Sequence, residues 1–322
     1  MLFALSAGFV ACESGSAGDP PEDGLAASDQ HGEPGACRHD VRLGGVLVDV
    51  HPEFPSVSGS IADGVVPASV FFLVEGSELG ECRLEKRILP FCEETCTFDQ
   101  LCNFDEVCVD YPENHSVGTL TLEGLSVPVR IDPLGEPGAI RYSFVDLQTP
   151  VVVPGDEVVV RASGDDSDFD GFTLRGRGVD SLAASIDKIV LRRDADCEVS
   201  WDAGVGDAHI TIVINIDQHG ASPIRLFCDT VDKGSLMVPK SLIGQLMDAG
   251  TTGFPSMTMT RRTVEWREIE DVEDGCIEFE VSSSVNGSLL VDGHIPCNND
   301  ADCPDDMICD ESIQSCVDNR GG

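Results

Sequence analysis

The amino-acid sequence predicts an all-β protein with two immunoglobulin-like β-sandwich units, two small disulfide-rich knots and one short helix. Short runs of alternating apolar and polar residues recur along the chain, separated by turns rich in Gly and Pro, which is typical of antiparallel sheets. Two segments hold four cysteines each and too few apolar residues to form a core. A helical pattern is clear in a single segment near residue 240. Together these observations favour strands held by disulfides over any helical architecture.

The first 36 residues predict export and attachment to a membrane. Leu2–Ala11 is an apolar run that is long enough for a signal peptide and too short for a membrane span. The run ends in FVAC at Cys12 and resembles the lipobox of bacterial lipoproteins, which predicts a lipid on Cys12. The alternative is a buried apolar N-terminal strand. Residues 13–36 are rich in Gly, Pro, Ser, Ala and acid, so we expect a disordered tether.

The first half of the chain then divides into three predicted segments. Residues 37–91 form an N-terminal β segment, residues 92–112 the first cysteine knot, and residues 113–196 the first β-sandwich. Alternation or β-branched residues predict these strands: 41–50, 57–61, 68–74, 118–125, 127–131, 140–144, 157–162, 172–174 and 188–192.

Residues 197–296 form the predicted second, immunoglobulin-like sandwich, and residues 297–322 the second knot. Its expected strands are 198–201, 209–216, 224–228, 235–238, 256–263 and 276–283. The helix is expected at 239–249, because Pro239 suits its first position, its apolar residues share one face, and Gly250 closes it. The spacing of Cys197, Trp201 and Cys228 is similar to that of immunoglobulin domains.

The cysteines predict disulfides rather than zinc. The repeated gap of five residues between them does not match the short C-x2-C or C-x4-C knuckle of structural zinc sites. We expect two bridges within each knot, with connectivity left open, among Cys92, Cys96, Cys102 and Cys108 and among Cys297, Cys303, Cys309 and Cys316. Cys197–Cys228 is the most natural further pair and Cys37–Cys82 the next. Cys276 then remains as a buried thiol or an intermolecular link.

The charge balance excludes nucleic acid as a partner. The 322 residues contain 58 acids and 20 bases, a net charge of −38. Such a surface repels nucleic acid and anionic lipid headgroups at long range. The excess of sixteen arginines over four lysines is interpreted as genomic or saline bias rather than function. Aromatic residues are scarce, so a sugar-stacking platform has little support.

Two clusters could hold metal ions. Asp166, Asp168 and Asp170 precede Gly171 in a D-x-D-x-D-G run that could bind calcium, although Arg177 stands where an EF-hand needs a bidentate acid. A solvated acidic turn is the alternative. A second set, which could suit zinc, comprises Asp207, His209, Asp217, His219 and Asp229. No nucleophile elbow or phosphate loop is present in the sequence, so no catalytic residues are predicted.

Two stretches resemble a group of uncharacterised lipoproteins from myxobacteria and related deltaproteobacteria. The first, from Gly80 to Leu125, combines C-x9-C-x3-C-x5-C-x5-C with YPENHSVGTLTLEGL; the second is DQHGASPIRLFCDTVDKGSLMVPKSLIGQLMDAGTTGFPSMTMTRR. The acidic C-terminal knot is also similar. This resemblance implies the bacterial cell envelope, with an outer-membrane lipoprotein facing the periplasm or the exterior, and it implies no activity.

The sequence therefore predicts an exported, lipid-anchored surface protein that binds or supports other molecules and is not an enzyme. Its expected partners are the membrane, through the lipid, and a surface protein or polysaccharide. A calcium-dependent adhesin is the alternative function, and a secreted metal-dependent hydrolase is the second alternative.

Overall fold

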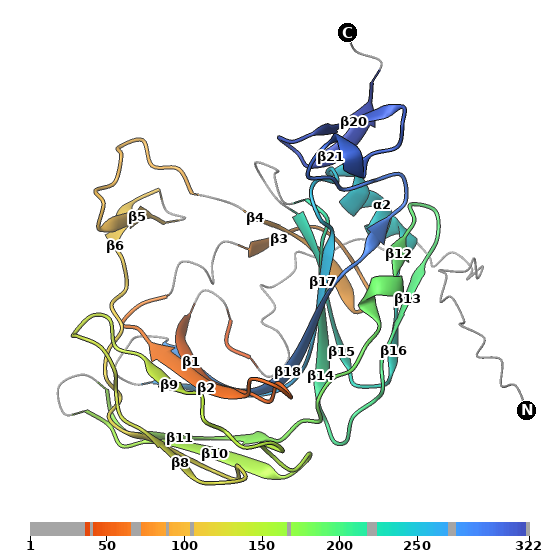
Figure 1. Cartoon of the computed structure of the whole chain (residues 1–322). Helices are drawn as coiled ribbons and strands as arrows, with labels where there is room; N and C mark the ends of the chain where they lie inside the picture. Colours follow the sequence, from red (N-terminus) through yellow and green to blue (C-terminus); the bar gives the residue numbers. More distant parts are fainter. Residues whose placement is uncertain are drawn as a thin grey trace, which may run out of the picture.

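The computed structural model confirms an all-β protein with two disulfide-rich knots and, among the residues it describes, one α-helix (Figure 1). It describes residues 36–38, 41–65, 72–87, 90–103, 106–165, 169–217, 224–269 and 275–319. The predicted lipid site Cys12 and the predicted tether up to residue 35 lie outside the described residues. Among the described residues, the structure has no helix long and apolar enough to span a membrane.

A nine-stranded sheet runs through the whole protein in the order β3-β4-β15-β14-β17-β18-β1-β2-β9. Its strands are β1 (Arg42–Asp49), β2 (Ser56–Ile61), β3 (Phe72–Leu79), β4 (Cys82–Arg87), β9 (Tyr142–Phe144), β14 (His209–Asn215), β15 (Ile224–Val231), β17 (Ser256–Glu268) and β18 (Cys276–Ser288). All neighbours in it are antiparallel except β1 and β18. Because it takes strands from three of the predicted segments, the two predicted sandwiches share one large sheet.

A second, four-stranded sheet covers one half of the large sheet and forms the first core. Its order is β11-β10-β7-β8, and its strands are β7 (Leu120–Glu123), β8 (Val129–Ile131), β10 (Glu157–Ala162) and β11 (Phe172–Arg177). Alternate residues such as Val158 and Val160 point inward and pack with Val48 and Phe279. The residues between them therefore point to the outer surface.

The other half of the large sheet is covered by smaller elements that enclose the second core. They are the ribbon of β13 (Cys197–Ser200) and β16 (Ser235–Val238), the pair β12 (Val190–Leu191) and β19 (Leu290–Val291), and helix α2 (Lys240–Asp248). Ile210, Ile212 and Ile214 of β14 pack in this core with Leu242 of α2. The helix agrees with the predicted 239–249 to within one residue at each end, with Pro239 acting as the N-cap.

Strands β17 and β18, each thirteen residues long, extend across both cores (Figure 1). At the junction Arg261 of β17 and Asp232 form a buried ion pair, with both side chains 2% exposed. The guanidinium also donates to the carbonyls of Asp180, Ser181 and Asp202. This pair therefore ties the segments that connect the two cores to the sheet beneath them.

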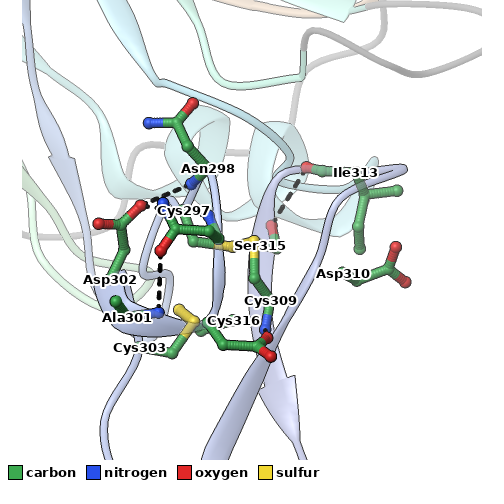
Figure 2. Close-up of a disulfide and its surroundings, with 12 residues drawn as sticks. Cys297, Asn298, Ala301, Asp302, Cys303, Cys309, Asp310, Ile313, Ser315 and Cys316 are labelled. Carbon is green, nitrogen blue, oxygen red and sulfur yellow. Dashed lines mark hydrogen bonds between the residues drawn. A yellow bond between two sulfur atoms is a disulfide. The ribbon is translucent and has the colours of Figure 1, made fainter.

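Six disulfides connect the described cysteines. Each knot closes on itself, joining its first cysteine to its third and its second to its fourth: Cys92–Cys102, Cys96–Cys108, Cys297–Cys309 and Cys303–Cys316. Figure 2 shows the two bridges of the second knot, which contains strands β20 (Met307–Asp310) and β21 (Ser315–Asp318). The corresponding pair in the first knot is β5 (Gln100–Cys102) and β6 (Cys108–Asp110).

The remaining bridges differ from the predicted pairs. Cys37 bonds to Cys276 and Cys82 to Cys228, which replace the predicted Cys37–Cys82 and Cys197–Cys228 bridges. Cys197 is a buried thiol outside the six disulfides. The physical reason is strand pairing: Cys82 and Cys228 are directly opposite on β4 and β15, and parallel pairing of β1 with β18 places the N-terminal cysteine beside Cys276.

Candidate functional site

The outer surface of the four-stranded sheet carries a row of arginines and threonines. The register of the sheet places Arg130 of β8 opposite Thr121 of β7, Thr121 opposite Arg161 of β10, and Arg161 opposite Thr173 of β11. All four residues occupy outward positions between buried neighbours. One side chain per strand thus forms a continuous line across the sheet.

Strand β17 adds a third arginine at the end of this row. Its second half passes along the edge of β11, where Thr263 bonds to the backbone of Arg177 and Glu265 accepts from the amide of Arg175. Side chains two residues apart on a strand lie on the same face. The next residue in this series, Arg267, therefore reaches the end of the row beside Thr173.

These residues line a shallow groove of about 640 Å³, here named the arginine groove. Its lining consists of Thr119, Thr121, Arg130, Arg161, Ala162, Ser163, Gly171, Phe172, Thr173 and Arg267. The described lining thus contains three guanidinium groups and four hydroxyl groups but no carboxylate. This is a locally cationic surface on a chain of net charge −38.

The described acids around the groove make only long contacts with its arginines. Arg130 Nη2 lies 3.4 Å from Asp132 Oδ1, and Arg161 Nη2 lies 3.6 Å from Glu123 Oε2. Asp132 is engaged by the Thr119 hydroxyl, which donates to it over 2.8 Å and lowers the pKa of Asp132. Exposed ion pairs of this kind contribute at most about 1 kcal/mol. The guanidinium groups can therefore turn toward a ligand at little cost.

Several arginines elsewhere in the protein are held much more firmly. Arg83 and Arg225 contact the buried Glu85 at 2.8 and 2.6 Å. Arg262 contacts the buried Asp229 at 2.8 Å, and Arg42 contacts the buried Glu278 at 2.7 Å. These arginines, together with Arg261, serve the internal structure of the large sheet. The arginine groove differs because its cations are exposed and loosely paired.

The geometry suits an extended ligand with separated negative charges. Arg130 and Arg161 stand two strands apart, which is about 10 Å at the usual strand spacing. Guanidinium groups bind carboxylates with two parallel hydrogen bonds. The intervening threonine hydroxyls can donate to or accept from the hydroxyl groups of a ligand. The groove can thus contact two anionic groups and the polar chain between them.

The predicted calcium loop cannot be placed in full. Asp166 and Asp168 lie outside the described residues, and Asp170 is exposed. Calcium at this loop stays a prediction.

The second predicted metal set is separated in space. His209 Nδ1 lies 2.6 Å from Asp229 Oδ1, so these two residues meet. The other oxygen of Asp229 accepts from Arg262, which makes the carboxylate part of a structural ion pair. Asp217 accepts from Thr252 beyond the opposite end of β14, about 26 Å along the strand direction from His209. His219 lies outside the described residues, and Asp207 is exposed.

Sequence reasoning missed the arginine groove, although part of its signal was present. Arg130 and Arg161 each lie at an outward position of an alternating strand, where a single arginine is ordinary. Only the register of four strands and the edge contact of β17 bring the three arginines together. The acid-free lining could not be expected from a chain whose acids are spread along its whole length.

Comparison with known proteins yields no family. No protein-family model matches the chain, and no curated protein matches it. Among solved structures, it is similar to a tetra-tandem repeat from the extending region of a large adhesion protein, with 11% identity, a TM-score of 0.18, and coverage of 79% of this chain and 76% of that one. It is also similar to part of a bacterial ice-binding adhesin, with 11% identity, a TM-score of 0.17, and coverage of 79% and 66%. TM-scores this low do not indicate a shared fold, so these similarities carry no functional argument.

Proposed function

We propose that this protein is an exported, non-catalytic binding protein of the cell envelope that holds an anionic polysaccharide in the arginine groove. The observation that carries the proposal is the cross-strand row of Arg130, Thr121, Arg161 and Thr173, extended by Arg267. It presents cations and hydroxyl groups in a line and has no carboxylate in its described lining.

The net negative charge of the protein favours an anionic ligand of low charge density over nucleic acid. Nucleic acid carries one negative charge per about 1.7 Å and would be repelled by a chain of net charge −38. A polysaccharide with one carboxylate on each or every second sugar carries its charges farther apart and meets less repulsion. Its carboxylates suit the guanidinium forks, and its hydroxyl groups suit the threonines.

Location outside the cytoplasm is supported by the cysteine chemistry. Six disulfides persist in an oxidising compartment and would be reduced in a bacterial cytoplasm. The FVAC run at Cys12 and the polar segment after it support attachment through a lipid. A lipid-anchored protein of this kind would hold a wall or capsule polysaccharide close to the membrane.

The proposal is tested by calorimetric titration with oligogalacturonate, a chain of uronic acids. Arg161→Gln and Arg267→Gln should each weaken binding about tenfold or more, because a charge-assisted hydrogen bond contributes about 1.5–3 kcal/mol. Arg175→Gln is the matched control. Arg175 lies on the same outer surface, exposed and paired with Glu157 at 2.8 Å, and does not line the groove. Its replacement should change affinity by less than about twofold.

A second ligand distinguishes ionic recognition from nonspecific binding. Methyl-esterified oligogalacturonate keeps the sugar rings and loses the charges, so it should not bind measurably. Equal binding of the esterified ligand would contradict the proposal. So would unchanged affinity in Arg161→Gln, or an equal loss in Arg175→Gln.

A further inference from the structure

Two segments contain the cysteines of the predicted knots: residues 91–111 are here named knot 1, and residues 297–318 are named knot 2. The two share a covalent plan, with bridges between first and third and between second and fourth cysteines. In both, the third and fourth cysteines lie opposite each other on the two strands of a small antiparallel sheet, without being bonded to each other. Both segments contain six or seven acids and neither Lys nor Arg. The two knots are therefore matched in scaffold and charge.

The knots differ in what they expose. Knot 1 presents five large apolar side chains to solvent, namely Phe91, Phe98, Val107, Val109 and Tyr111. Phe98 is 98% exposed and Phe91 78% exposed. In knot 2 the only described side chain of this class is Ile308, at 39%. A small segment thus contains an unusual share of the exposed apolar surface of the described chain.

Knot 2 packs against the body of the protein. The amide of Gly253 donates to the carbonyl of Ile313, and His294 contacts both the carbonyl of Gly253 and the hydroxyl of Ser315. Cys297 and Cys316 of knot 2 are buried. In knot 1 all four cysteines are partly buried and none is fully buried, and β5 and β6 stand away from the two large sheets (Figure 1). Its apolar residues therefore do not serve as packing onto the body of the protein.

The backbone of knot 1 holds Phe98 outward. The amide of Gln100 donates to the carbonyl of Thr97, which closes a turn with Phe98 at its second position. The Thr97 hydroxyl donates to Asp99 over 2.6 Å, and the Cys96–Cys108 bridge fixes the start of the turn. The backbone that carries Phe98 therefore needs little ordering on binding. Aromatic residues such as Phe are enriched at the cores of protein interfaces.

The charges around Phe98 define the chemistry of its partner. Knot 1 contains six acids, and no Lys or Arg occurs between residues 88 and 129. The Thr97 hydroxyl lowers the pKa of Asp99, so this carboxylate stays ionised beside Phe98. Aromatic side chains within an acidic rim complement an apolar pocket with basic residues around it.

We propose that knot 1 is a docking surface for a protein partner that presents an apolar pocket rimmed by Lys and Arg. Phe98 enters the pocket, Phe91 and Tyr111 widen the apolar contact, and the acids pair with the basic rim. The lining of the arginine groove contains no residue of knot 1, so the two proposed surfaces share no residues.

A phage-displayed library of small folded domains, selected on the whole chain with its disulfides intact, tests this proposal. The randomised surfaces of the enriched domains should combine Lys or Arg with aromatic or aliphatic residues. Phe98→Ser should weaken their binding about tenfold or more, since a central aromatic anchor dominates such contacts. Ile308→Ser in knot 2 is the matched control and should leave binding within about twofold. Both side chains are exposed, so neither variant should change the melting temperature.

Three outcomes would overturn the proposal. One is the absence of basic residues from the randomised surfaces of the enriched domains, and another is equal binding to Phe98→Ser and the unmodified chain. The third is a different occupant: concentration-dependent dimers in sedimentation, or flotation with phosphatidylcholine vesicles, that disappear in Phe98→Ser. Dimers would identify a second copy of the chain, and flotation would identify a lipid surface.

Discussion

Replacing Arg261 by Met should destabilise the protein strongly, because Arg261 and Asp232 form a buried ion pair between the two cores. Arg261 Nε donates to Asp232 Oδ2 over 2.7 Å. Asp232 also accepts from the indole nitrogen of Trp201 over 2.6 Å and from the amide of Gly204 over 2.9 Å. Arg261→Met would remove the cation and leave a buried carboxylate with two neutral donors.

The expected loss is about 3–5 kcal/mol in the free energy of unfolding, the usual cost of leaving one partner of a buried pair uncompensated. The three backbone carbonyls that accept from Arg261 would lose their donor as well. Arg175→Met is the matched control, because Arg175 and Glu157 form an exposed pair at a similar distance of 2.8 Å. Its cost should be about 1 kcal/mol or less.

Urea unfolding followed by tryptophan fluorescence measures both variants. The chain has two tryptophans, and Trp201 bonds directly to Asp232, so its emission reports on the junction. With a urea slope of about 3 kcal/mol per M, the midpoint should fall by about 1 M or more in Arg261→Met. A fall no larger than that of Arg175→Met would refute the reasoning.

The double variant Arg261→Met/Asp232→Leu separates the charge from the packing. Apolar residues of similar volume can replace a buried pair with little loss or even a gain. The double variant should therefore be more stable than Arg261→Met alone. If its loss equals the sum of the two single losses, the pair is not coupled and the uncompensated charge is not the cause.

Five further predictions concern other parts of the chain. Tyr142→Phe should cost about 1–3 kcal/mol, because the Tyr142 hydroxyl bonds two backbone groups at 2.9 Å; thermal melts should show the loss. Burial raises the pKa of Tyr142, so the wild type should lose stability as the pH rises above about 10, where the unfolded tyrosine ionises first, and Tyr142→Phe should lose less. Gentle reduction with differential alkylation should open knot 1 first, then knot 2, with early proteolysis after Cys297 and the buried core bridges last. Mass analysis of the protein made in a lipoprotein-competent bacterium should show an acylated Cys12; an intact, unmodified N-terminus would contradict the lipid anchor. Calcium should give heat on titration at millimolar concentration if Asp166–Gly171 binds it, and no heat would leave an acidic turn.

The features predicted correctly are those encoded by nearby residues. The helix depends on Pro239, Gly250 and an apolar face within one short segment, and the structure places it at Lys240–Asp248. Alternation within single runs likewise predicts strands such as His209–Asn215. The all-β fold follows from these local patterns, because few other segments could form a helix.

The features that could not be predicted depend on pairing between distant segments. Cys37 and Cys276 are separated by 239 residues, and Cys82 and Cys228 by 146. No local pattern specifies that β4 lies beside β15, which is what places Cys82 opposite Cys228. The shared nine-stranded sheet has the same cause. In contrast, the bridges of the knots span only 10–13 residues, which makes them a property of each cluster.

The same distinction applies to the candidate sites. His209 and Asp217 are close in sequence, but they lie at opposite ends of an extended strand and so cannot share an ion. Arg130 and Arg161 are 31 residues apart in sequence and two strands apart in the sheet. A site on a sheet surface is thus set by register, which a single sequence does not reveal.

The distribution of arginines gives the arginine groove a specific dependence on salt. Among the described residues, five arginines are held by buried carboxylates. Because the chain has 58 acids and 20 bases, its outer surface is mainly acidic and repels an anionic polymer at long range. At physiological ionic strength this repulsion is screened beyond about 8 Å, whereas contacts inside the groove are shorter than that. Added salt therefore weakens the long-range repulsion more strongly than the short contacts in the groove, and the two effects on affinity partly cancel. The affinity should therefore fall less steeply with salt than expected for three arginine contacts alone. A generally cationic surface would instead give a steep salt dependence, so the measured slope distinguishes local recognition in the groove from it.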